Sequence, residues 1–544
     1  MTVTGPIGVS HGRVVGPVVQ MPEPLAEPAA RATSDPVAEA ERVAAAMTTV
    51  AASLRERATR VSGEAREILE ANAMMAADPT LLADARALTV AGESAERAAW
   101  LAVSAVADVL AVQGGRMAER VSDLHDIRNR LVAAILGLPA PGLPDRVEPF
   151  VLVARDLAPA DTALLDPATC LALVTEEGGP TSHSAILARS LGIPAVVAVR
   201  GATAIPNGTV VLVDGFTGLV EVSPSTELVT ETAAQPVLAE FSGSGATSDG
   251  HAVPLLANVG SPASVDAAVA AKAEGIGLFR TEFCFLERDT APTVTEQVAA
   301  YRQVFAAFAG RTVIVRTLDA GADKPLAFVT DAGEQNPALG MRGIRTSWRH
   351  PALLDDQLEA IALAADLEKA LVSVMAPMVA TVDEAEEFAA SCRRHGIANA
   401  GAMVETPAAA LMAVPLLAAV DFLSLGTNDL AQYTMAADRQ LGDLATLNDP
   451  WQPAVLRLIR ITAEAGASAA KPVGVCGEAA ADPVLAAVLV GLGVTSLSMS
   501  ARAIPAVATR LAGVTLAQCR AAADVAHAAH SAAAARLAAV SVLG

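Results

Sequence analysis

The pattern of hydrophobic and polar positions changes character several times along the chain. Residues 1–22 read as short strands punctuated by Gly, and a Pro-rich joint follows them. From about 37 to 136, Gly and Pro become rare, and Ala, Leu, Glu and Arg recur at the spacing of amphipathic helices. We therefore predict an all-α module of several long helices, with turns at Asp78-Pro79 and Gly114-Gly115.

Strand-like runs return after a Pro- and Gly-rich stretch at 138–149. The runs PFVLVARDL, TCLALVTE, PAVVAV and GTVVLVDG are separated by turns and a helix-like segment. Such alternation is typical of a compact α/β domain of about 80 residues. We expect the N-terminal strands to complete this domain, which makes the helical module an insertion within it.

The second half of the chain repeats one rhythm. From about residue 249 onward, short apolar runs alternate with helix-like segments, as expected for a (β/α)8 barrel whose functional side chains gather at the C-terminal ends of the strands. The eight runs are PLLANVG, GIGLF, TVIVRTLD, VSVMAPMV, GAMVET, FLSLGTND, PVGVCGE and SLSMS.

The predicted fold class is multidomain α/β, with an α/β domain, an inserted all-α domain and a following TIM barrel. The predicted boundaries are 1–25 and 143–223 for the α/β domain, 26–142 for the helical domain, 224–248 for a linker and 249–544 for the barrel.

Composition does not indicate a membrane protein. Hydrophobic residues make up 53% of the 544 residues, but much of that share is Ala, which favours helices more than membrane anchoring. The longest apolar stretches, such as 407–420 and 483–494, fall short of the roughly 20 residues that a spanning helix needs. The N-terminus shows no signal peptide. We expect a soluble, cytoplasmic protein without membrane insertion.

Charge and Cys usage exclude further classes. The formal net charge of −21 argues against nucleic acid as a partner, because phosphate backbones select basic surfaces. A basic protein partner or a metal-bridged anion is compatible with this charge. The five Cys residues are scattered without a CxxC pair, which argues against a disulfide framework or a zinc site.

One His stands in a setting suited to chemistry. His183 lies in GGPTSHSAILARS, where a Gly-rich turn precedes an apolar helix and hydroxyl side chains surround the ring. A His at a helix start faces backbone N–H donors, which favours the neutral, nucleophilic imidazole and suits a phosphoryl group carried on it. A lone His in a Gly-rich turn is more often an incidental buried residue, and the other seven His are expected to be surface or helix-face residues.

Several Arg side chains stand at strand ends or in nearby loops of the predicted barrel. They are Arg280 in GLFRTEF, Arg316 in VIVRTLDAGADKP with Lys324 nearby, Arg342 in NPALGMRGIR and Arg439 in AADR. One Arg in a strand is usually a salt-bridged core residue. Several on one barrel face favour an anion clamp, because guanidinium forks match phosphate and carboxylate oxygens.

Two carboxylates accompany the Arg set. Glu405 in MVETPAAA and Asp429 in GTNDLAQYT follow different strands, and together with substrate oxygens and water they suit Mg²⁺. The plainer interpretation is a capping Asp and an Arg-paired Glu. Asn428 is placed to bond a phosphate directly. Such a set supplies the positioning and charge neutralisation that phosphoryl transfer needs.

A Cys lies at another strand end. Cys476 stands in GVCGEAA, beside Glu478. A buried apolar Cys is the plain interpretation. In the functional interpretation its thiol delivers or removes a proton at carbon.

These motifs resemble one family over about residues 5–540. The His loop, GIGLFRTEF, RTLDAGADKP, NPALGMR, VETPAAA, SLGTNDLAQYTMAADR and VCGEAA are similar to Enzyme I of the bacterial phosphotransferase system, the phosphoenolpyruvate–protein phosphotransferase, and occur in that family's order. ERVSDLHDIRNRLVAAILG resembles the end of the family's helical insertion, which docks the phosphocarrier protein HPr.

The resemblance implies a reaction. Phosphoenolpyruvate and Mg²⁺ bind the barrel, the phosphoryl group moves in line to a ring nitrogen of His183, and pyruvate leaves. The phosphohistidine domain then swivels and passes the group to HPr. The family dimerises through the barrel, which implies a homodimer.

The resemblance also implies a role for individual residues. Glu405 and Asp429 hold Mg²⁺, and Cys476 protonates the enolate carbon with Glu478 as a supporting residue. Thr162 in LAPADTALL steadies the active His. The substrate-binding set carried over from the family is Arg280, Arg316, Arg342, Lys324, Asn428 and Arg439.

The chain departs from the family pattern in four places. Pro180 stands in the His loop where most members have Arg, and GADK stands where GGDK is usual. The linker at 224–248 is shorter than the family norm and contains Gly243 and Gly245, so the swivel geometry does not carry over. The helical module matches poorly before about residue 115, and single HPr contacts are not assigned.

Other protein classes share part of this pattern. Pyruvate phosphate dikinase and phosphoenolpyruvate synthase share the His loop and barrel motifs, but both need a large nucleotide-grasp domain, where this sequence has the helical insertion. A nitrogen-linked signalling paralogue is expected to add an N-terminal sensor domain. A catalytically silent scaffold has no chemical reason to keep the His, the Arg set, both carboxylates and the Cys.

Overall fold

A computed structural model places the chain in two compact units, Met1–Gln235 and Pro236–Gly544. The residues that the structure describes are 6–10, 12–21, 25–31, 33, 35–59, 64–113, 115–138, 148–155, 157, 165–178, 184–185, 188, 191–215, 218–233, 241–286, 288–321, 326–331, 333–439, 441, 444 and 446–544.

The first unit contains a mixed sheet. Its seven described strands lie in the order β1-β5-β4-β3-β2-β6-β7, with β2 to β5 parallel, β1 antiparallel to β5, and β6 antiparallel to both β2 and β7. The two N-terminal strands complete the sheet, as predicted. The strands are β1 (Ile7–Ser10), β2 (Arg13–Gln20), β3 (Phe150–Ala154), β4 (Cys170–Thr175), β5 (Ala195–Val197), β6 (Val210–Asp214) and β7 (Leu219–Val222).

Alternate residues of these strands enter two separate cores, because side chains in a strand point to opposite faces. Leu152 belongs to one core, and Val151 and Val153 belong to the other. Ala185 and Ala188 are buried in the first core with Leu152. The chain just after the His loop therefore packs on one face of the sheet.

The predicted helical module is confirmed in the described residues. Asp78 accepts from the backbone N–H of Thr80 and caps the third helix, which Pro79 begins. Leu54 and Ile127 are among the residues of one shared core. The helices are α1 (Pro36–Ala58), α2 (Glu64–Ala76), α3 (Pro79–Val90), α4 (Ala95–Gln113) and α5 (Gly115–Leu136).

Ordered structure occupies part of the expected linker. Helix α8 (Thr226–Ala233) packs against β2, and Ala246 forms a bridge with Ala252. The backbone N–H of Ser248 donates to the carbonyl of Val514 (2.9 Å). The boundary between the two units falls between α8 and this bridged segment, and the linker bounds of 224–248 remain a prediction.

The second unit is built on a closed parallel barrel of eight described strands, β8 to β15 in chain order, with β15 paired to β8. Each predicted apolar run forms one strand, so the predicted TIM barrel is confirmed. The strands are β8 (Leu255–Val259), β9 (Ile276–Arg280), β10 (Thr312–Arg316), β11 (Leu371–Ala376), β12 (Ala400–Val404), β13 (Phe422–Leu425), β14 (Val473–Val475) and β15 (Ser496–Met499).

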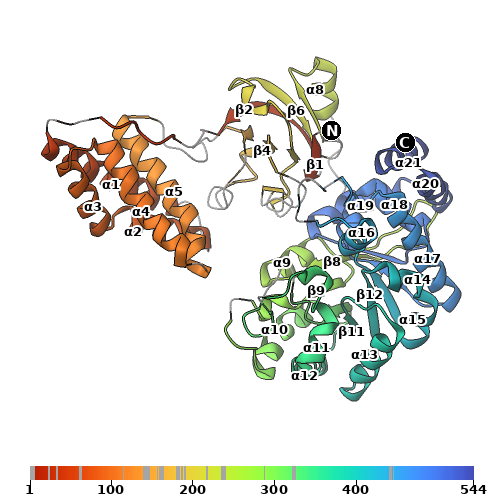
Figure 1. Cartoon of the computed structure of the whole chain (residues 1–544). Coiled ribbons are helices and arrows are strands. Elements are labelled where there is room, and N and C mark those ends of the chain that lie inside the picture. The colour runs from red at the N-terminus through yellow and green to blue at the C-terminus, as the bar shows by residue number, and fades with distance from the viewer. Residues whose placement is uncertain are drawn as a thin grey trace. The chain divides into compact units, whose positions relative to one another are not determined.

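Helices lie outside this ring of strands (Figure 1). Capping boxes such as Thr293–Glu296 and Thr381–Glu384 define where helices begin. Among the described residues, none of the helices has the length and apolar content to cross a membrane. The helices are α9 (Pro262–Ala270), α10 (Val294–Ala307), α11 (Thr346–Arg349), α12 (Pro351–Glu368), α13 (Val382–Arg394), α14 (Pro407–Leu411), α15 (Ala413–Ala419), α16 (Thr427–Met435), α17 (Pro453–Ala469), α18 (Pro483–Gly491), α19 (Ile504–Ala512), α20 (Leu516–Ala528) and α21 (Ala532–Leu543).

Candidate active site at the strand ends of the barrel

The barrel gathers predicted site residues at the C-terminal ends of its strands. Arg316 is the last residue of β10, Glu405 directly follows β12, and Cys476 directly follows β14. Asp429 lies in the first turn of α16, after β13, and Arg342 lies in the long connection between β10 and β11. Since the strands are parallel, all five residues belong to one end of the barrel, where TIM-barrel enzymes carry their sites.

Arg316 is buried among carboxylates. Its Nη2 donates to Oε1 of Glu282 (2.5 Å), and its Nη1 lies 3.2 Å from Oδ2 of Asp319 and 4.0 Å from Oε1 of Glu405. Burial alone would lower the pKa of this guanidinium, but the three carboxylates raise it above its ordinary value. Arg316 is therefore a fixed, permanently charged cation.

Arg342 is held in the same way from a different segment. Its Nη2 donates to Oδ2 of Asp319 (3.0 Å), and its Nη1 donates to Oδ1 of Asp429 (3.0 Å) and to the hydroxyl of Tyr433 (3.1 Å). Asp319 thus bridges Arg316, at the end of β10, and Arg342, in the connection between β10 and β11. The bridge fixes the two guanidinium groups relative to each other.

Within the described residues, each of these two guanidinium groups has a buried donor without an acceptor. The Nε atoms of Arg316 and Arg342 have no hydrogen-bond partner within the described residues. A buried donor without an acceptor costs about 1–3 kcal/mol. An anion that accepts from these groups would remove that cost, so the pair suits a phosphate or carboxylate ligand.

The two predicted metal ligands, Glu405 and Asp429, lie close enough for their negative charges to repel each other. Glu405 is buried, and its Oε2 accepts from the backbone N–H of Met378 (2.8 Å). A Cβ at Gly426 would lie 2.7 Å from Cγ of Glu405, so only Gly permits this approach. Burial, together with the charges of Asp429 and Asp319, raises the pKa of Glu405 to about 7, although the charges of Arg316 and Arg342 act in the opposite direction. A divalent cation would relieve this crowding of negative charge.

Protein side chains alone do not complete a metal site in the described part of the chain. No group of three or more His, Cys, Asp or Glu side chains there is placed to hold a metal ion. Mg²⁺ commonly takes one or two carboxylates and fills its remaining positions with substrate oxygens and water. Glu405 and Asp429 meet that requirement as a pair.

Cys476 belongs to the packed interior of the barrel. It is buried with apolar neighbours that include Met403 and Phe422, and the hydroxyl of Ser424 donates to its Sγ (3.2 Å). Burial, together with the charge of Glu405, raises the pKa of the thiol to about 11, although the hydrogen bond from Ser424 and the charges of Arg316 and Arg280 act in the opposite direction. The thiol therefore stays protonated at neutral pH and is able to act as an acid.

The remaining described residues of the predicted set lie around this cluster. Nη1 of Arg439 lies 3.6 Å from Oδ2 of Asp429. Oδ1 of Asn428 accepts from the backbone N–H of Glu478 (3.1 Å), which joins the loops after β13 and β14. Arg280 ends β9 with an exposed side chain, and its charge acts on the Cys476 thiol.

Three predicted residues, His183, Lys324 and Thr162, lie outside the described residues. Directly after the first of them, Ser184 and Ala185 are helical and buried. A helix that begins at the His loop agrees with the sequence pattern, but the placement of His183 itself stays a prediction.

Sequence reasoning missed three residues of the cluster. Glu282 and Asp319 pair with the Arg side chains, and Tyr433 accepts from Arg342 while donating to the carbonyl of Ala338. The acidic pair stood within GLFRTEF and VIVRTLDAGADKP, two or three residues after an Arg, and that proximity was the available signal.

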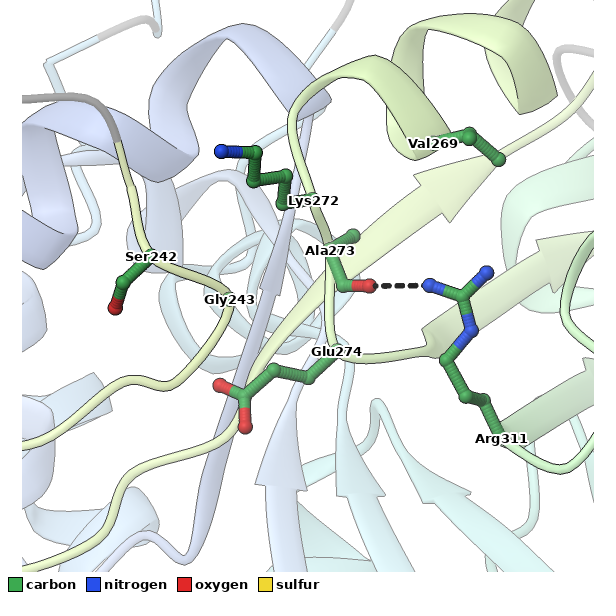
Figure 2. A pocket seen from close by; sticks show the side chains of 7 residues that line it. All are labelled: Ser242, Gly243, Val269, Lys272, Ala273, Glu274 and Arg311. Carbon is green, nitrogen blue, oxygen red and sulfur yellow. Dashed lines mark hydrogen bonds between the residues drawn. The ribbon is translucent and has the colours of Figure 1, made fainter.

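A separate cavity of about 440 Å³ lies near the opposite ends of the strands (Figure 2). Its lining includes Lys272, Glu274 and Arg311, which precede β9 and β10 in the chain. Arg311 already donates to two backbone carbonyls, and Glu274 accepts from two backbone N–H groups. These groups stabilise the N-terminal end of the barrel. In TIM barrels, residues at that end usually serve stability and not catalysis.

Known proteins resemble this chain over nearly its whole length. The chain matches three family descriptions, which are "PEP-utilising enzyme, N-terminal" over 6–120, "mobile domain" over 147–218 and "PEP-binding domain" over 240–516. A phosphoenolpyruvate-protein phosphotransferase of Streptomyces coelicolor is 56% identical over 99% of this chain and 98% of its own length.

The chain belongs to the phosphoenolpyruvate-protein phosphotransferase family. A phosphoenolpyruvate-protein phosphotransferase of Haloferax volcanii is 42% identical over 86% of this chain and 85% of its own. An NMR solution structure of an Enzyme I protein is 30% identical and covers 42% of this chain and 96% of its own, with a TM-score of 0.37. The resemblance and the enzyme class predicted from the motifs are confirmed: the chain is an enzyme of phosphoenolpyruvate-dependent phosphotransfer in the phosphotransferase system.

Proposed function

We propose that the barrel binds phosphoenolpyruvate with Mg²⁺, that a ring nitrogen of His183 takes the phosphoryl group, and that the group then passes to the phosphocarrier HPr while pyruvate is released. The observation that carries this proposal is the pair of buried guanidinium groups, Arg316 and Arg342, which Asp319 bridges and which each keep an unused Nε donor within the described residues. Their charge suits an anion with both phosphate and carboxylate oxygens.

The phosphate and carboxylate of the substrate need more donors than this pair supplies. We assign them to the other basic and amide side chains of the predicted set, which are Arg280, Lys324, Asn428 and Arg439. Arg280 and Arg439 support this assignment because each is close enough to the cluster to act on one of its members, Cys476 and Asp429 respectively. Thr162 is proposed to steady the ring of His183. The backbone N–H of Glu478, which donates to Asn428, is proposed to fix the first turn of α16.

Glu405 and Asp429 are the proposed protein ligands of Mg²⁺. Two observations support this assignment. The two carboxylates are buried and repel each other, and a site with only two protein carboxylates leaves positions for substrate oxygens and water, as Mg²⁺ prefers. When bound, Mg²⁺ would neutralise negative charge on the phosphate oxygens and orient them. The Arg side chains meanwhile hold the substrate so that the phosphorus faces the incoming imidazole.

The Cys476 thiol is the proposed acid at carbon. When the phosphorus–oxygen bond breaks, its electron pair stays on oxygen and leaves the enolate of pyruvate. The methylene carbon then takes the proton of the thiol, and the thiolate that remains is reprotonated from water. A thiol with a pKa of about 11 is fully protonated before this step, and the Ser424 hydroxyl that donates to Sγ stabilises the thiolate after it.

The variant Cys476→Ser tests this role. Its hydroxyl is a much weaker acid, so the rate of pyruvate formation should fall about 10²-fold or more while phosphoenolpyruvate still binds. Pyruvate release is measured by a coupled reductase assay, and binding by calorimetry. Cys519→Ser is the matched control, because Cys519 is also buried with a raised pKa but lies in α20. Unchanged turnover in Cys476→Ser would remove the proposed acid.

The acceptor and the assembly complete the proposal. The helical module is proposed to dock HPr, and its position in the chain together with the acidic balance of the protein supports a basic protein partner. We also propose that two copies pair through their barrels. The test is transfer of labelled phosphate from the protein to purified HPr without ATP. Failure of the label to move, or an absolute need for ATP, would refute the proposed acceptor or indicate a dikinase.

A further inference from the structure

A buried Gln links the C-terminal ends of β9 and β10, where Arg280 and Arg316 lie. Gln357 lies in α12 with 1% of its surface exposed. Its side-chain carbonyl accepts from the backbone N–H of Leu318 (2.8 Å). Its side-chain amide donates to the hydroxyl of Thr281 (3.1 Å) and to the hydroxyl of Tyr301 (3.0 Å). A single side chain thus holds the segments after β9 and β10 and a neighbouring helix.

The orientation of the Gln357 amide is dictated by its partners on the strand ends. The Thr281 hydroxyl uses its one hydrogen to donate to the backbone carbonyl of Arg316 (2.9 Å), so toward Gln357 it can only accept. The backbone N–H of Leu318 donates only, so it requires the carbonyl of the Gln357 side chain. Only a primary amide of this length supplies both kinds of group in these places.

The remaining branch of the network runs away from the site. The Tyr301 hydroxyl donates to Oε1 of Gln297 (2.9 Å), and Nε2 of Gln297 donates to the carbonyl of Pro292 (3.1 Å). Gln297 is buried like Gln357 and belongs to the same network. Through these bonds Gln297 contacts neither strand end, so a substitution of Gln297 is a suitable control for the same substitution of Gln357.

The residues that Gln357 holds are neighbours in sequence of the proposed anion clamp, which consists of Arg280, Arg316 and Arg342. Thr281 stands between Arg280 and Glu282, and Leu318 directly precedes Asp319. Glu282 and Asp319 are the carboxylates that fix Arg316, and Asp319 also reaches Arg342. A shift of either strand end would therefore move the clamp as a whole.

We propose that Gln357 is a positioning residue for phosphoenolpyruvate, which sets the spacing of the clamp without touching the substrate. This inference rests on the proposed function, because it requires Arg280 and Arg316 to bind substrate. Binding groups have to be held within about 0.5 Å of the productive geometry, and a displacement of about 1 Å costs roughly 10²-fold in rate. A buried amide with three directed bonds provides that restraint.

The experiment compares Gln357→Leu with Gln297→Leu in the full chain. Both replacements are similar in size, favour helix and remove buried hydrogen bonds of one network, so both should lower the melting temperature. Gln357→Leu is expected to raise KM for phosphoenolpyruvate and to lower kcat/KM roughly 10- to 100-fold. Gln297→Leu should keep values close to wild type. Equal kinetic changes in the two variants, or a loss of stability alone in Gln357→Leu, would overturn the proposal.

A second variant and a reference substitution complete the test. Thr281→Val keeps the shape of the side chain but removes the bridge from Gln357 to Arg316, so KM should rise even if Gln357→Leu does not fold. An unchanged KM in Thr281→Val would also overturn the proposal. Arg280→Ala reports on the proposed function itself. If Arg280→Ala retains the wild-type KM, the proposed site has failed; if it is impaired while Gln357→Leu behaves like Gln297→Leu, only the positioning role has failed.

Discussion

Replacing His183 by Ala is expected to abolish all phosphorylation of the protein by phosphoenolpyruvate. The proposed reaction places the phosphoryl group on an imidazole nitrogen of His183, whereas a hydroxyl of the same loop would form a phosphate ester. Wild-type protein incubated with labelled phosphoenolpyruvate and Mg²⁺ should carry a label that acid removes and base does not. In His183→Ala the label should be absent, and pyruvate–phosphoenolpyruvate exchange should stop with it.

The control for this experiment is another His of the same chain. His530 lies between α20 and α21 with an exposed side chain, so His530→Ala should be labelled like the wild type. A label that survives in His183→Ala would place the carrier elsewhere. A label stable to acid but lost in base would point to a hydroxyl acceptor, and a label lost in both would point to a carboxyl acceptor; either result would refute the central step.

The sequence predicted the barrel well because its strands are short, apolar and buried over most of their length. A run such as the one that becomes β12 is buried at every position, and burial of that kind leaves a continuous apolar signal between helical segments. The strand ends followed from the same pattern, since the polar residue after each run marks the end of a strand. Arg316, Glu405 and Cys476 were found in this way.

The pairing of the side chains could not be predicted, because it depends on contacts between distant segments. Gln357 bonds Leu318 across 39 residues, and Arg342 reaches Asp429 across 87. Neither separation corresponds to a helix or strand period. Glu282 was adjacent to a quoted Arg, but adjacency alone does not tell a counter-ion from a solvent-exposed acid.

Two of the plain interpretations turned out to be compatible with the functional ones. Arg316 is a salt-bridged core residue and also lies in the Arg and carboxylate cluster. Cys476 is a buried apolar Cys and also lies at a strand end within the influence of charged groups. The C-terminal ends of barrel strands are both core and candidate site, so burial does not argue against the proposed roles of these side chains.

The variant Glu405→Gln is expected to lower phosphoenolpyruvate turnover about 10²- to 10³-fold and to weaken activation by Mg²⁺. The replacement removes one carboxylate charge from the proposed metal pair, and the electrostatic contribution of a bound metal amounts to several kcal/mol. The fold should survive, because the remaining carbonyl of the amide can accept the hydrogen bond from the backbone N–H of Met378 that Glu405 now receives. Turnover is measured as pyruvate release against Mg²⁺ concentration.

A thermal measurement separates loss of metal from general damage. In the presence of a chelator, Glu405→Gln should melt no lower than the wild type, because a neutral amide relieves the repulsion between position 405 and the carboxylates of Asp429 and Asp319. Added Mg²⁺ should raise the melting temperature of the wild type, since it binds the native state, and should have little effect on Glu405→Gln. Glu384→Gln, a change at the capping box of α13, should keep the wild-type response to Mg²⁺. If Glu405→Gln responds to Mg²⁺ like the wild type, the metal is held by other groups and the proposed pair is wrong.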